Sequence, residues 1–119
     1  MSPTPEELTE RLDSFDADRR RAALEELYNL AEDGEIETES TDGWVNMHSH
    51  TFFSYNGYGY SPSHFAWEAY RRGLEVAGIV DFDVLDGTDE FLEAGRLLGL
   101  KTAAGFETRV FIKEYRDRV

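Results

Sequence analysis

The spacing of apolar residues divides the chain into a helical N-terminal part and a C-terminal part in which strands and helices alternate. Within residues 1–40, apolar side chains recur every three or four positions, which is the period of an amphipathic helix. Thr4 is placed to cap a first helix, and Asp16 or Asp18 is placed to cap a second one. Polar residues fill most of positions 35–43, so this segment is interpreted as a linker.

The C-terminal part contains short apolar runs separated by two helical patterns. Residues 44–48 and 76–80 are strand-like, and the second run lacks polar alternation, as expected for a strand covered on both faces. The helices open at Ser61-Pro62 and at Asp86-Gly87, and residues 101–105 lead through Glu107 to strand-like residues at 110–112. This order predicts an α/β fold, a βαβαβ parallel sheet with right-handed crossovers that is preceded by the helical pair.

Charge is distributed unevenly between these two parts. The 119 residues carry a formal charge of −13, and residues 1–43 contribute fourteen acidic side chains against four arginines. Such a surface disfavours binding to a nucleic-acid duplex or an anionic membrane. The chain lacks cysteine, which excludes disulfides, and it has no apolar run of membrane-spanning length. We therefore expect a cytoplasmic protein, with an acidic helical segment over residues 1–40 and a β/α domain over residues 43–119.

Metal-binding residue types gather where the predicted strands end. His48 and His50 follow the first apolar run, Asp81 and Asp83 follow the second, and Glu107 lies near the end of the third. Residues at i and i+2 project from one face of a strand, and the carboxyl ends of parallel strands meet at one edge of the sheet. Imidazole and carboxylate together suit zinc, manganese or iron(II), so the pattern predicts a site for a divalent metal.

Four motifs in this order resemble the N-terminal portion of the polymerase and histidinol phosphatase (PHP) family. They are His48-Ser49-His50-Thr51, Ser61-Pro62 at a helix start, the segment Gly78–Gly87 with Asp-Phe-Asp at its centre, and Gly105-Phe106-Glu107-Thr108. The resemblance covers residues 43–112 and implies part of a distorted (β/α)7 barrel with two or three metal ions. It also implies a phosphoesterase, in which metal-activated water attacks a phosphorylated small molecule or a nucleotide.

The resemblance assigns a role to each of these side chains. His48 and His50 match the first metal-binding pair of the family, and Glu107 matches the glutamate that bridges two metals. Asp81 and Asp83 match the two aspartates of an Asp-His-Asp motif, so both are expected to serve catalysis as ligands or as partners of ligands.

Two departures from the family pattern lower the expected number of metals. Phe82 occupies the place of the central histidine in Asp-His-Asp, and Tyr55 stands where the family has an aspartate. Both missing side chains normally serve one metal, so we expect one or two ions. Residues 43–112 also provide only about two βα units and a further strand, at roughly 30 residues per unit, whereas a closed barrel needs on the order of 200 residues.

These departures keep a second hypothesis open. The chain is then an inactive PHP remnant that acts as a binding, regulatory or self-associating module, because an incomplete barrel exposes sheet edges and apolar surface. Its partner is either a second copy or a missing C-terminal half. His64 and Arg109 are further candidates for contacting a phosphate group, and the alternative for His64 is a partly buried histidine without a ligand.

Overall fold

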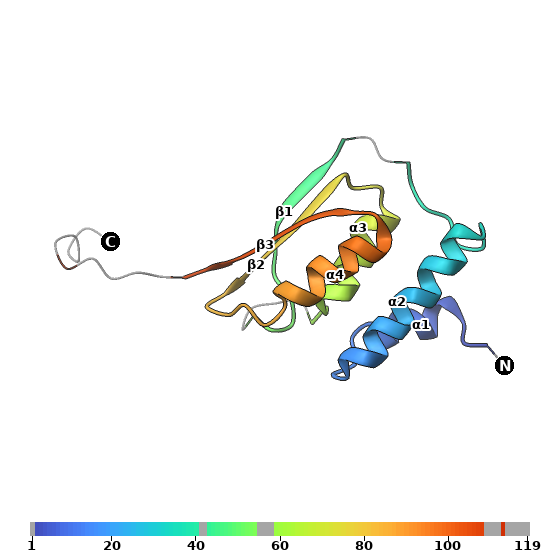
Figure 1. Ribbon diagram of the computed structural model, residues 1–119, viewed down its shortest axis with the longest axis horizontal. Helices are drawn as coiled ribbons and strands as arrows, with labels where there is room; N and C mark the ends of the chain where they lie inside the picture. The colour runs from blue at the N-terminus through green and yellow to red at the C-terminus, as the bar shows by residue number, and fades with distance from the viewer. Residues whose placement is uncertain (1, 41–42, 55–58, 109–112, 114–119) are drawn as a thin grey trace.

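The computed structural model describes residues 2–40, 43–54, 59–108 and 113, which form a three-stranded parallel sheet and four helices (Figure 1). The elements are α1 (Pro5–Arg11), α2 (Ala17–Glu32), β1 (Val45–Ser49), α3 (Pro62–Arg71), β2 (Val76–Phe82), α4 (Thr88–Leu98) and β3 (Lys101–Glu107). The predicted βαβαβ order after a helical pair is confirmed over this part of the chain. The strand expected at residues 110–112 lies outside the described residues.

The helices begin where the sequence places their caps. The Thr4 hydroxyl accepts a hydrogen bond from the backbone N–H of Glu7, and Asp16, one of the two candidates for the second cap, accepts from Asp18. Ser61 accepts from the N–H of His64 and starts α3, with Pro62 in the first turn. Each cap satisfies a backbone donor that has no partner within its own helix.

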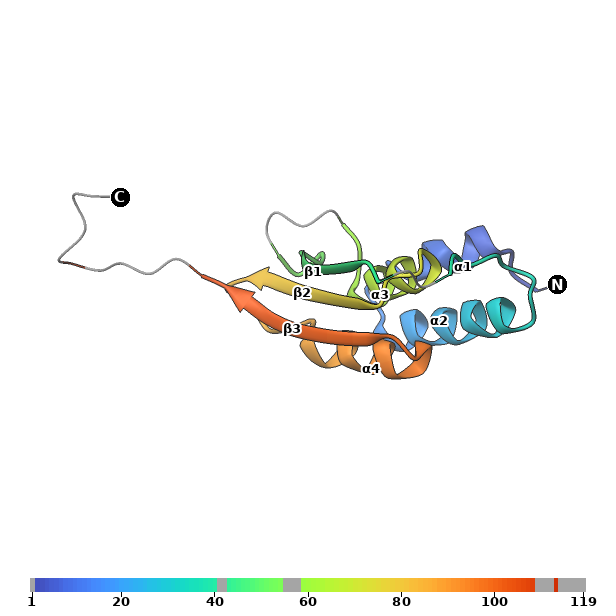
Figure 2. The same cartoon turned by 90° about the horizontal axis from the view of Figure 1, so that it is seen from above.

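All three strands run in the same direction, in the order β1-β2-β3. Both crossovers advance the same way along the sheet, so α3 and α4 lie on the same side of it (Figure 2). Ala77 and Ile79 of β2 point toward these helices and are buried, whereas Val76 and Val80 are half-buried. The expectation that β2 is covered on both faces is therefore wrong for the described residues, because the described helices cover only one face.

The N-terminal helices add a third layer behind α3 and α4 (Figure 1). Leu8 and Leu12 from the first helix and its C-cap join Leu24 and Leu27 of α2 in the same core as Trp67 of α3. This core also contains Phe91 of α4 and Ile79 of β2. The acidic segment therefore packs against the β/α part through its apolar side, and most of its charged side chains are exposed, with Arg20 as a buried exception.

One predicted core position differs in the structure. Phe15 follows Leu8 and Leu12 at helical spacing, but α1 ends at Arg11 and Phe15 lies in the connection to α2 with 93% of its surface exposed. Its ring still contacts Phe52, at a centroid distance of 5.8 Å. The apolar spacing continues past the end of α1 at Arg11. Phe15 is therefore not on a helix face, although its spacing from Leu8 and Leu12 suggests one.

Among the residues that the structure describes, no helix combines the length and apolar character needed to span a bilayer.

Candidate metal centre

Three of the predicted side chains converge at the carboxyl edge of the sheet. His48 lies within β1, His50 directly follows this strand, and Glu107 is the last residue of β3. One potential ligand atom from each lies within 4.8 Å of the other two. The three residues come from strands on either side of β2, so the fold assembles the group across the full width of the sheet.

A bulge in β1 sets the direction of the histidines. Asn46 pairs with Ala77 and Ser49 pairs with Ile79, so β1 has one more residue than β2 over this interval. The side chain of Asn46 accepts a hydrogen bond from the N–H of His48 at 3.0 Å, which holds the bulge. Gly78 lies opposite, and a Cβ at this position would approach the Cα of Met47 to 3.1 Å. The absence of a side chain at residue 78 thus allows the bulged strand to lie close to β2.

Two buried polar atoms of the group make no hydrogen bond within the part of the chain that the structure describes. Glu107 Oε1 lies close to the Nε2 atom of His48 and 3.8 Å from the Nε2 atom of His50. Although Glu107 Oε1 is buried, neither contact has the geometry of a hydrogen bond, and the buried Nδ1 of His50 also lacks a hydrogen-bond partner. Buried polar groups without partners are costly, so they mark a site where a further group is expected to bind.

The donor set fits a divalent metal. Two imidazoles and one carboxylate are the ligands of many zinc sites and of iron(II) sites with open positions. Donors at about 2.1 Å from a tetrahedral ion lie roughly 3.4 Å from one another, close to the spacing of His50 and Glu107. The His48 side chain is 66% exposed and that of His50 only 14%, so the site opens to solvent on the His48 side.

Asp81 lies at the same edge but belongs to a different set of contacts. It is 2% exposed and accepts two hydrogen bonds from Thr51, one from the backbone N–H at 2.5 Å and one from the hydroxyl at 2.6 Å. Asp83 is exposed, has φ of 60°, and donates its backbone N–H to the carbonyl of Glu107 at 2.8 Å. Neither aspartate belongs to the group of three, and their catalytic role stays a prediction.

Phe82 lies beside the metal group on the uncovered face of the sheet. It is the register partner of Glu107, and its ring stacks on the imidazole of His50 at a centroid distance of 4.8 Å and an angle of 15°. The aromatic ring thus occupies space that a histidine would use to reach the same centre. The other departure from the family pattern, Tyr55, lies outside the described residues, as does the phosphate candidate Arg109.

His64 lies in a separate buried cluster. Its Nδ1 atom is 2.8 Å from Asp13 Oδ2, its Nε2 atom is 3.8 Å from Glu68 Oε1, and its ring stacks on Tyr60 at 3.8 Å. Only 6% of the side chain is exposed, and two carboxylates flank it. This arrangement ties the connection after α1 to α3. It favours the alternative of a buried histidine without a ligand, because neighbouring carboxylates repel a phosphate group.

The His64 cluster makes a pH dependence predictable. Burial acts to lower the pKa of His64, but Glu68 and Asp13 outweigh it and raise the pKa above the ordinary value of 6.5. His64 in turn lowers the pKa of Glu68 to about 2, against the effect of burial and with help from Arg71 and Arg72. The pair therefore stabilises the fold at pH values between the pKa of Glu68 and the pKa of His64. The contribution of His64 is lost as the pH rises from 6.5 through its raised pKa.

We expect the His64→Gln variant to lose this part of the pH dependence. The difference in free energy of unfolding between the wild type and His64→Gln should shrink as the pH is raised from about 6 to about 9. Urea denaturation at several pH values, with EDTA present, measures it. His48→Gln is the control, because its parent side chain is exposed and outside this cluster. A difference that is constant with pH contradicts the assigned role of His64.

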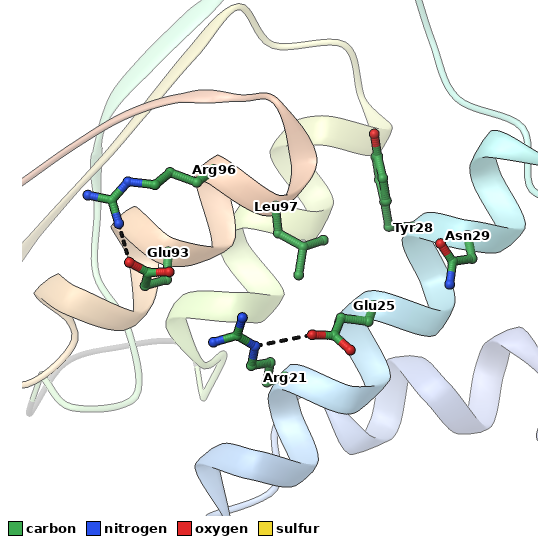
Figure 3. Close-up of a pocket in the computed structure, with 7 residues that line it drawn as sticks. All are labelled: Arg21, Glu25, Tyr28, Asn29, Glu93, Arg96 and Leu97. Atoms are coloured by element: carbon green, nitrogen blue, oxygen red, sulfur yellow. Dashed lines mark hydrogen bonds and ion pairs between the residues drawn. The ribbon is translucent and has the colours of Figure 1, made fainter.

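A hollow between α2 and α4 is lined by charged side chains that are already paired with one another (Figure 3). Its two arginines, Arg21 and Arg96, are each paired with a glutamate of their own helix, Glu25 and Glu93. All four side chains are largely exposed, so water solvates them well. With their charges locally neutralised, these arginines do not form an anion-binding site.

Some side-chain contacts between distant residues carry no recognisable sequence signal. Thr51 stands next to His50 within the histidine motif, but its partner Asp81 is 30 positions away. Asp13 and His64 are 51 positions apart. For the contact between Thr51 and Asp81, the sequence indicates only that Thr51 directly follows the proposed ligand His50.

Comparisons of the chain with protein-family models, with curated protein sequences and with solved structures give no significant match.

Proposed function

We propose that this protein is a PHP-type metal-dependent phosphoesterase, or the N-terminal portion of one, with its metal held by His48, His50 and Glu107. The observation that carries the proposal is the convergence of these three donors at one edge of the sheet. Glu107 is far in sequence from the two histidines, and all three are residues to which the family resemblance assigns metal binding. The buried Oε1 of Glu107 adds support, because it makes no hydrogen bond within the described residues and faces the Nε2 atoms of both histidines.

The topology of the described strands is compatible with a barrel. The order β1-β2-β3 does not reverse, and α3 and α4 lie on one side. Successive strands of a barrel have this arrangement, and so does each half of a doubly wound sheet. The proposed (β/α)7 barrel places the uncovered face, with the metal group at its carboxyl end, toward the barrel interior.

The chemistry of the proposed site follows from its donors. A bound zinc, manganese or iron(II) ion supplies Lewis acidity, which lowers the pKa of water and polarises a phosphate ester. Glu107 contributes negative charge that balances the cation, and the exposed side of His48 leaves room for a phosphorylated small molecule or a nucleotide. Phe82 stacks on the ring of His50 and shields one of its faces.

Hydrolysis of p-nitrophenyl phosphate tests the proposal. We expect turnover with added zinc or manganese, and Glu107→Gln should lower the rate by at least about 100-fold, because replacing a ligand costs more than the 10–100-fold typical of residues that only support ligands. The control is Glu75→Gln, which removes one negative charge from an exposed position at the start of β2. Equal rates for wild type and Glu107→Gln contradict the proposal.

A second candidate function is a PHP remnant that binds a partner or a second copy without catalysis. It is favoured by the placement of Asp81, whose two oxygens are both engaged by Thr51, and by Phe82 at the place of a ligand. The uncovered sheet face also presents Val45 and Met47, which are 51% and 46% exposed. Metal binding that depends on Glu107 without any hydrolysis is the result that selects this candidate.

A further inference from the structure

We propose that Asp81 is a positioning residue that holds His50 through Thr51 and binds no metal itself. The inference rests on the proposed metal site. The family resemblance leaves two tasks open for Asp81, ligand or partner of a ligand, and the inference selects the second. Its basis is a set of contacts between β2 and the segment that directly follows β1.

The first step is the pairing of Asp81 with Thr51. Both residues are almost completely buried, at 2% and 0% exposure. Thr51 donates its backbone N–H to one carboxylate oxygen and its hydroxyl to the other. A buried carboxylate that accepts two such hydrogen bonds has its charge compensated and fixes the position of its donor. Thr51 uses two of the roughly four lone-pair positions of the Asp81 carboxylate, and Asp81 is not among the donors that converge at the metal group.

The second step is the position of Thr51 in the chain. It follows His50 directly and lies two residues beyond the end of β1 at Ser49, so its hydrogen bonds to Asp81 fix the backbone just after His50. Ser54 strengthens this link, because its hydroxyl accepts the N–H of Phe82 and its own N–H bonds the carbonyl of Thr51. The segment 51–54 is therefore held against β2 at two consecutive residues of that strand.

The third step is that the two residues after Asp81 contact two of the proposed ligands. Phe82 stacks on the ring of His50, and the N–H of Asp83 bonds the carbonyl of Glu107. Asp81 thus supports His50 through Thr51, and Phe82 contacts His50 directly. Asp83 contacts the backbone of Glu107. Support of this kind usually tunes metal affinity by 10–100-fold.

Zinc titration of the Thr51 variants tests the role of Asp81. Thr51→Val keeps the shape of the side chain but removes the hydroxyl donor, and we expect the affinity measured by calorimetry to fall about 10–100-fold. Thr51→Ser restores the donor and should stay within about threefold of the wild type. Asp81→Asn should weaken binding by a similar factor, and the double variant Asp81→Asn with Thr51→Val should lose little more than either single variant, because the two residues act as a unit.

Two outcomes overturn the proposal. If Thr51→Val leaves the affinity unchanged while Asp81→Asn abolishes binding, then Asp81 is itself a ligand. The proposal also fails if the losses from the two single variants add fully. The Thr51 pair decides the question even if Asp81→Asn does not fold.

A readout without metal separates this inference from the proposed function. NMR of the imidazole resonances in the metal-free chain should show a larger shift for His50 than for His64 when Thr51 is changed to valine. If the wild type binds no zinc but this shift is present, the proposed function is wrong and the positioning role stands. If His50 is unmoved, the positioning role is wrong whether or not zinc binds.

Discussion

Replacing Arg20 with alanine is expected to lower the free energy of unfolding by about 3 kcal/mol or more. The Arg20 side chain is 5% exposed and forms two contacts with the carboxylate of Glu90, including a hydrogen bond of 2.9 Å from Nε to Oε2. It also donates to the carbonyl of Ser14 at 2.8 Å. Removing the guanidinium leaves a largely buried carboxylate without its cation, and this is the costly way to break such a pair.

Glu90 makes this pair a junction between three helices. Its Oε2 atom also accepts hydrogen bonds from the N–H and the hydroxyl of Ser63, at the start of α3. The pair therefore joins α2 to both α3 and α4, and its loss should loosen the N-terminal layer from the rest of the core. For a small domain with a total stability of about 5–15 kcal/mol, this is a large fraction.

The neighbouring residue provides a matched control. Arg21→Ala removes the same charge one position later in the same helix, but Arg21 is 64% exposed and pairs with Glu25 within one turn. Such a pair contributes about 0.3–0.5 kcal/mol. Urea denaturation of both variants at one pH compares them. If the two variants differ by less than about 1 kcal/mol, the Arg20 pair does not have the role assigned to it.

The second large effect is expected on metal binding. Replacing His50 with alanine should reduce the affinity for zinc by more than about 100-fold, beyond the range typical of residues that only support a ligand. His50 is the least exposed of the three donors, and its position is fixed by Phe82 and by the segment after β1. The remaining pair of donors is too few for a stable zinc site.

His64→Gln is the control for this experiment. Each change removes one imidazole, but His64 lies in the cluster with Asp13 and Glu68, outside the group of three. We expect His64→Gln to keep the zinc affinity of the wild type. Calorimetric titration of protein freed of metal measures both variants. Equal affinities for His50→Ala and His64→Gln contradict the assignment, and they indicate that zinc binds to the acidic surface instead.

Local features of the fold were predictable because their causes are local. Ser61-Pro62 marks the start of α3 through a cap and a fixed backbone angle, both of which act within one turn. Three short apolar runs with two helices between them lead directly to parallel strands. The same rule predicts that His48, His50 and Glu107 lie at one edge, since the carboxyl ends of parallel strands meet there.

Other features depend on contacts between distant residues. Asp81 has the sequence neighbours expected of a ligand, yet its engagement by Thr51 depends on how the segment after β1 folds back on β2. The salt bridge between Arg20 and Glu90 joins residues 70 positions apart, and no periodic pattern connects them. The bulge in β1 arises from the pairing of two strands and not from the residues of β1 alone.

Crystallography at the zinc absorption edge tests the central claim most directly. We predict that a crystal soaked in zinc gives one strong anomalous peak at about 2.0–2.2 Å from an imidazole nitrogen of His48, an imidazole nitrogen of His50 and a carboxylate oxygen of Glu107. Thr51 and Asp81 should keep their mutual hydrogen bonds in the same crystal. A peak that lies elsewhere, or that includes Asp81 among its ligands in place of one of these three residues, contradicts this account.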